Sequence, residues 1–135
     1  MLWRRVSDTL IALAPLALSG ALLAAFGVIF DLPFNFANVL VLPALLGIGI
    51  DSGIHLVHRW RHLGAEGDPL LETSTARGVV QSTLTTIASF GTLAISPHPG
   101  MASLGLLLTI GLSLILVANL ILIPALVAGR SGELK

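Results

Sequence analysis

The sequence has no cysteine and no tyrosine, and only 10% of its 135 residues are charged. Without cysteine the chain has no disulfide and no thiolate metal site. Soluble domains carry about 25% charged residues, so this chain has too little charge to cover a soluble surface. Aromatic residues make up 5% of the chain and no basic tract occurs. The base-stacking and phosphate-binding surfaces of a nucleic-acid-binding protein are therefore not expected.

Apolar residues are abundant: 55% of the chain is hydrophobic and the mean hydropathy is +0.96. A helix that crosses a bilayer needs about 20 mostly apolar residues. Four segments fit, at about residues 9–30, 38–58, 79–96 and 101–127. The first contains an uncharged run, Leu10–Phe30, which is longer than the roughly 7–15-residue core of a signal peptide. We therefore predict an all-α membrane protein, with residues 1–135 forming a single four-helix transmembrane bundle.

The connections between the four segments differ in length and polarity. Asp31–Asn35 and Ser96–Gly100 are short and contain helix-breaking proline or glycine, which predicts tight turns. Residues 59–78 form a longer polar loop. Within this loop, Pro69 followed by Leu70 and Leu71 predicts a short helix lying along the membrane interface.

The basic residues indicate an orientation. On the four-span arrangement all seven fall on one side: Arg4, Arg5, Arg59, Arg61, Arg77, Arg130 and Lys135. Loops rich in lysine and arginine remain in the cytoplasm. We therefore expect a multi-pass protein whose middle loop and both termini are cytoplasmic.

Asp51 is the most informative residue, because it lies within the second apolar segment. A carboxylate at the centre of a spanning helix costs roughly 2.5–3.5 kcal/mol on insertion scales, and such residues usually face a bundle interior or a wet cavity. One interpretation is a structural hydrogen bond between helices. We favour the other, a carboxyl that gains and loses a proton. Ser52 is its neighbour, and His55 shares its helix face at a spacing of four.

His55 and His58 lie near the cytoplasmic end of this segment, so an interfacial position is the alternative to a role in proton exchange. Two histidines and a carboxylate also raise the question of a metal ion. The sequence offers no further ligand cluster, so we expect no metal and no cofactor. It contains no nucleophile–base pair, phosphate loop or metalloprotease motif either, and we do not expect an enzyme.

Glycines lie on either side of Asp51 in the sequence, and hydroxyl residues are frequent in the next apolar segment. Gly47, Gly49 and Gly53 allow close helix approach, either as a packing seam alone or to bring Asp51 against partner groups. The third segment is rich in hydroxyls, among them Thr85, Thr86 and Ser89. These side chains either bond to carbonyls of their own helix or face Asp51 and support a proton relay.

The order of these motifs resembles a known superfamily. The stretch Gly47-Ile-Gly-Ile-Asp51-Ser-Gly-Ile-His55, a basic loop, and then Ser82-Thr-Leu-Thr-Thr-Ile-Ala-Ser-Phe-Gly91 are similar to resistance–nodulation–division (RND) transporters, in particular the MMPL and hopanoid-transporter-like branch. Nearly the whole chain takes part in the resemblance. In that branch tyrosine often follows the aspartate, whereas this sequence has Ser52.

The resemblance implies the last four helices of an RND-type twelve-helix transporter in a bacterial inner membrane. It implies that Asp51 takes part in a proton relay that drives export of lipids or other hydrophobic cargo. A companion transporter half, or a homo-oligomer, is then expected to supply the partner of Asp51. The alternative is a lipid- or sterol-sensing-type bundle that binds lipid without pumping.

Overall fold

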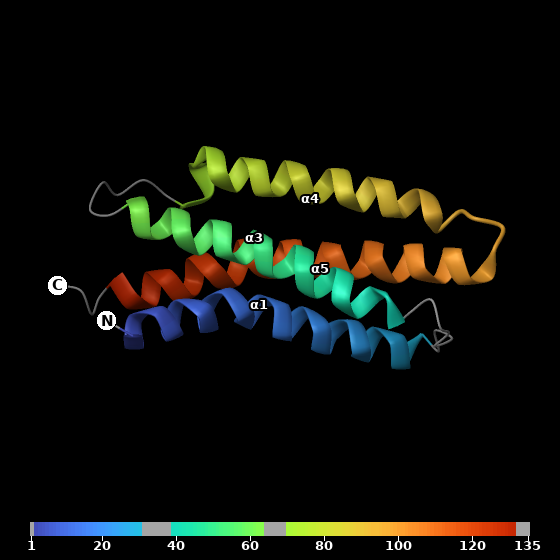
Figure 1. Ribbon diagram of the computed structural model, residues 1–135, viewed down its shortest axis with the longest axis horizontal. Coiled ribbons are helices and arrows are strands. Elements are labelled where there is room, and N and C mark those ends of the chain that lie inside the picture. Colours follow the sequence, from blue (N-terminus) through green and yellow to red (C-terminus); the bar gives the residue numbers. More distant parts are fainter. Residues whose placement is uncertain (1, 31–38, 64–69, 132–135) are drawn as a thin grey trace.

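The computed structural model describes residues 2–30, 39–63 and 70–131. These residues form four long helices and one short 3-10 helix: α1 (Leu2–Ile29), α3 (Val41–Leu63), η1 (Leu70–Glu72), α4 (Ser74–Leu93) and α5 (Pro99–Ser131). The long helices lie side by side (Figure 1). The start of α1, the end of α3, the start of α4 and the end of α5 lie at one end of the bundle, here called the terminal end. The predicted all-helical, four-helix architecture is confirmed.

The most apolar helix, α5, packs against each of the other three long helices. A helix that is hydrophobic on all sides is expected to be buried. Accordingly, Leu112 and Ile123 of α5 have no solvent exposure. The neighbouring helices each present one face to α5, so the bundle is organised around it (Figure 1).

The core divides into two clusters along the bundle. Near the terminal end, Ile11, Leu56 and Ile123 pack together. Towards the other end, Leu23, Leu45 and Leu112 belong to the second cluster. Each cluster combines α1, α3 and α5, so these three helices are held together along much of their length.

The short helix expected after Pro69 is a single turn, η1, while Pro69 itself lies outside the described residues. Leu70 is buried in the core cluster near the terminal end instead of lying on the membrane surface, whereas Leu71 is exposed. Thr73 then caps α4, because its side-chain oxygen accepts a hydrogen bond from the backbone N–H of Ala76 at 3.2 Å. The start of α4 is thereby fixed against the bundle.

Three helices contain segments long and apolar enough to cross a membrane: Thr9–Ile29, Val41–Trp60 and Pro99–Val127. With 20 residues α4 is long enough, but its polar side chains lower its hydropathy and it is not among them. A crossing by α4 therefore stays a prediction. The turn expected at Ser96–Gly100 lies between α4 and α5, and Pro99 begins α5. The turn expected at Asp31–Asn35 lies outside the described residues.

Candidate functional site

Asp51 lies midway along α3 and points away from the bundle core. Its side chain is 75% exposed and that of His55 is 62% exposed. The spacing of four residues places both on one helix face, and His55 Nε2 lies 3.4 Å from Asp51 Oδ1. The two groups form an ion pair whenever the imidazole is protonated. The four helices therefore present an acidic group and its basic partner at their surface.

A hollow of about 280 Å³ adjoins this pair between α3 and α4. We call it the polar hollow, and its lining residues are Asp51, Ser52, His55, Thr75, Gly78, Val79 and Ser82. Hydroxyl residues of α4 thus do lie near Asp51, but they come from the first half of that helix. Thr85, Thr86 and Ser89 are not among the lining residues.

Thr75, Gly78 and Val79 are lining residues that sequence reasoning missed. Thr75, Gly78, Val79 and Ser82 follow the spacing 0, 3, 4, 7, which places them on one helical stripe. This spacing was readable in the sequence. Which stripe of α4 faces Asp51 was not, because it depends on how α4 rotates against α3.

The hydroxyls of the second half of α4 bond to their own helix. Thr85 donates to the carbonyl of Gln81, Thr86 to that of Ser82 and Ser89 to that of Thr85, each at 2.9 Å. Ser52 likewise donates to the carbonyl of Ile48 at 2.9 Å. Such bonds need no partner helix, but each hydroxyl oxygen keeps lone pairs that can accept a bond from water.

The three glycines of α3 have different surroundings. A β-carbon on Gly49 would lie 2.9 Å from Leu16 Cδ1, and one on Gly53 would lie 2.9 Å from the Ala12 carbonyl oxygen. At Gly47 an added β-carbon would meet no atom within 4 Å. Gly49 and Gly53 therefore lie at close contacts with α1, whereas Gly47 faces open space in the described bundle.

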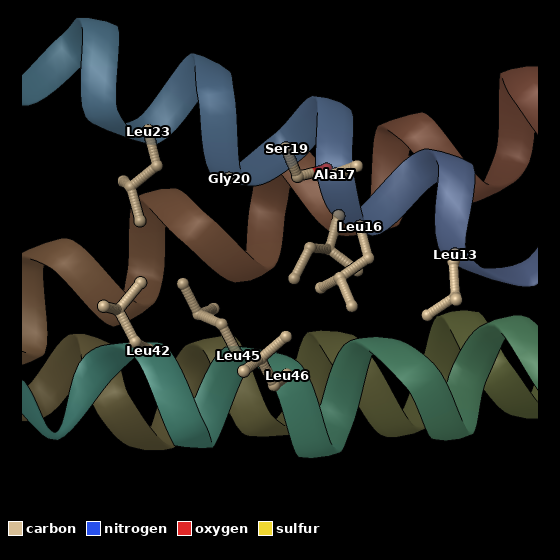
Figure 2. Close-up of a pocket in the computed structure, with 10 residues that line it drawn as sticks. Leu13, Leu16, Ala17, Ser19, Gly20, Leu23, Leu42, Leu45 and Leu46 are labelled. Carbon is tan, nitrogen blue, oxygen red and sulfur yellow. The ribbon is translucent and has the colours of Figure 1, made fainter.

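A second hollow, of about 400 Å³, lies between α1, α3 and α5. Figure 2 shows the side chain of Leu23 in α1 pointing towards that of Leu42 in α3. We call it the apolar hollow, and it is lined by Leu13, Leu16, Ala17, Ser19, Gly20, Leu23, Leu42, Leu45, Leu46 and Ile115. The hydroxyl of Ser19 is donated to the Pro15 carbonyl at 2.6 Å. The hollow is therefore suited to hydrocarbon.

Two buried side-chain nitrogens in the described part of the chain have no hydrogen-bond partner, Arg59 Nε and Asn119 Nδ2. The Asn119 side chain lies in the centre of α5 at 1% exposure, and its Nδ2 has no hydrogen-bond partner in the described structure. The described residues contain no group of three or more His, Cys, Asp or Glu side chains placed to hold an ion.

Comparison with known proteins identifies the family. The MMPL family profile matches residues 9–135. The hopanoid transporter HpnN of Rhodopseudomonas palustris is 43% identical over 129 residues, and that of Burkholderia multivorans is 37% identical over 129 residues. The putative membrane protein MJ1562 of Methanocaldococcus jannaschii is 38% identical over 105 residues. No solved structure gives a significant match.

These alignments cover most of this chain but little of its relatives. They include 93% of the chain and 14% of either HpnN sequence, and 73% of the chain and 27% of MJ1562. The chain belongs to the MMPL family. It is a multi-pass membrane protein of a transporter family and not an enzyme, which confirms the resemblance drawn from Asp51 and its surrounding motifs.

Proposed function

We propose that the chain is a membrane module of a proton-driven MMPL-type exporter of lipids or other hydrophobic compounds, with Asp51 as the proton-carrying group. The observation that carries this proposal is the Asp51–His55 pair beside a polar hollow, directly after the apolar first part of α3. A carboxyl in such a segment is costly, and a neutral side chain would serve packing at lower cost. Reversible protonation gives a reason for the charge.

The cargo class follows from the relatives and from the chemistry of the helices. Two relatives are named as hopanoid transporters, and hopanoids are hydrophobic lipids. We propose a hydrophobic or lipid cargo for the complete transporter. We further propose that the module has four spans in a bacterial inner membrane. Both termini would be cytoplasmic, because all seven basic residues fall on the side of the termini in a four-span arrangement.

The proposal includes a partner protein that covers Asp51 and His55. Asp51 and His55 are largely exposed at the surface of the four helices, so in a membrane they need another polar surface or water against them. A companion transporter half, or a second copy of the chain, would cover this face. The supporting roles proposed for Ser52 and His55 fit their place at the polar hollow, whereas Thr85, Thr86 and Ser89 would act only through such an assembly.

Infrared absorption of the protonated carboxyl in lipid vesicles, followed through a pH titration, tests the proton relay. Asp51→Asn should remove a band that titrates in the wild-type chain. Glu72→Gln is the matched control, because Glu72 is an exposed carboxylate in η1 outside the apolar helices. A titrating band that survives in Asp51→Asn, or an Asp51 that stays ionised throughout, contradicts the proposal.

The second candidate is a lipid- or sterol-sensing-type bundle without pumping, and the apolar hollow favours it. A sensing bundle binds lipid equally well whether or not residue 51 can be protonated. Binding of a sterol-like fluorescent lipid to the wild-type chain and to Asp51→Asn separates the two functions. Equal binding together with an Asp51 that does not titrate would favour the sensor.

A further inference from the structure

The polar hollow extends from Asp51 towards the terminal end of the bundle. Thr75 and Gly78 belong to the first turns of α4, and α4 starts at that end (Figure 1). The residues of α3 also run from Asp51 towards the terminal end, because α3 ends there. His55 is four residues beyond Asp51, so it lies about 6 Å nearer the terminal end. Asp51, His55 and the polar hollow therefore lie along one line that leads towards the terminal end.

The absence of a side chain at Gly78 leaves space in this hollow. A β-carbon built on Gly78 would meet no atom within 4 Å. Glycine within a helix is less favourable than alanine, and no close packing contact at Gly78 accounts for it. Thr75 and Ser82, one turn to either side, add hydroxyls to the same lining.

Among the side chains that the structure describes, few titratable groups surround the hollow. Asp51 and His55 are the titratable side chains that line it, and α4 contributes only Thr75, Gly78, Val79 and Ser82. Arg77 of α4 and Glu72 of η1 are exposed and do not line it. His58 and Arg59 lie further along α3 and do not line it either. Among the described side chains of α1 and α5, none reaches it. A proton entering here meets His55 and Asp51.

We propose that the polar hollow is a water-filled branch through which protons reach and leave Asp51 from the terminal end, with His55 as the exchange partner and Gly78 keeping the branch open. A protonated His55 gives its Nε2 proton to Asp51 Oδ1 and becomes neutral, and it is then protonated again by a hydronium proton that the water in the hollow relays from the solution at the terminal end. Release follows the same steps in reverse. This inference rests on the proposed protonation of Asp51.

Cysteine reactivity tests for water in the hollow without any transport assay. The chain has no native cysteine, so Thr75→Cys and Ser82→Cys each introduce a single thiol. Leu84→Cys is the control, since Leu84 is exposed on α4 but does not line the hollow. Only the hydrated thiolate reacts with a charged, membrane-impermeant methanethiosulfonate. We expect labelling of the hollow positions from the terminal-end side of oriented vesicles to exceed the control by about tenfold. Equal rates overturn the proposal.

A plug in the hollow tests the proton path itself. Gly78→Leu should slow protonation of Asp51 after a pH jump, followed by carboxyl infrared absorption, and leave the final extent unchanged. Ala88→Leu adds a similar side chain at an exposed position of α4 outside the hollow and should leave the rate unchanged. Far-ultraviolet circular dichroism checks that both variants keep their helices.

The outcomes separate this inference from the proposed function. An unchanged rate in Gly78→Leu, with Asp51 still titrating, overturns the path but leaves the proton relay standing. A wild-type Asp51 that never titrates overturns both. Labelling rates at Thr75→Cys and Ser82→Cys then still decide whether the hollow holds water.

Discussion

The backbone of α3 at Gly53 lies against the carbonyl oxygen of Ala12 in α1, since a β-carbon on Gly53 would be 2.9 Å from that oxygen. Gly53 is two residues from Asp51, and successive helical residues are about 100° apart. The two residues therefore lie on nearly opposite sides of α3. The side of α3 that carries Gly53 packs against α1, and the opposite side carries the Asp51 carboxylate at the surface.

This contact predicts that Gly53→Ala destabilises the bundle. The nearest atom is backbone oxygen, which cannot move away as a flexible side chain can. We expect the free energy of unfolding, measured in mixed micelles by circular dichroism, to fall by about 1–3 kcal/mol, as for overpacked cores. In the control, Gly47→Ala, the methyl group enters open space and stability should hold or rise. Equal stability of the two variants would contradict a tight contact at Gly53.

Replacing Asn119 by leucine should not harm stability. Nδ2 is buried without a partner, and leaving a buried donor unpaired costs about 1–3 kcal/mol. Leucine has the same branched shape as asparagine and lacks the donor, so the free energy of unfolding should stay constant or increase. A clear loss of stability in Asn119→Leu would mean that the amide has a bonding partner in the membrane, such as water.

Filling the apolar hollow should exclude a bound hydrocarbon chain. A β-carbon on Gly20 meets no atom within 4 Å, so Gly20→Leu can place its side chain among the leucines of Figure 2. We expect native mass spectrometry to find less co-purified lipid on Gly20→Leu than on the wild-type chain. Gly47→Leu serves as the control outside this hollow. Unchanged lipid retention in Gly20→Leu would contradict lipid occupancy of the hollow.

His55→Gln should slow proton exchange at Asp51 without abolishing its protonation. A positioned general acid or base typically accelerates proton transfer by 10²–10⁴-fold, so the protonation rate after a pH jump should fall by roughly 100-fold. His98→Gln, in the turn before α5, is the control and should have no effect. Added imidazole should restore part of the rate in His55→Gln, which a purely structural role for His55 would not allow. A wild-type rate in His55→Gln excludes His55 from the exchange.

Much of the architecture could be predicted from local pattern. The long apolar runs predicted four helices, and the observed helices follow these runs, because runs of this length and composition favour helix wherever they are buried. The pairing of Asp51 with His55 was equally local, since a spacing of four fixes two residues on one face of a helix. The family resemblance also rested on short-range motifs around these residues.

Leu70 illustrates what pattern alone could not settle. Its apolar side chain suited either a membrane surface or a protein core, and only the position of η1 against α3, α4 and α5 placed it in the core. The hydroxyls of α4 present the same difficulty. Several stripes of that helix are polar, and the rotation of α4 decides that Thr75 and Ser82, rather than Thr85 and Ser89, lie beside Asp51.

The sequence by itself determined the helical class, the membrane environment, the family and the position of one carboxylate within an apolar segment. These properties depend on composition and on spacing within single helices. Only the tertiary structure decided that Gly53 faces α1, that Asp51 faces outwards, and that the first half of α4 completes the polar hollow. Each depends on how one helix rotates against another, which is set by side-chain packing summed over the whole interface and not by any local motif.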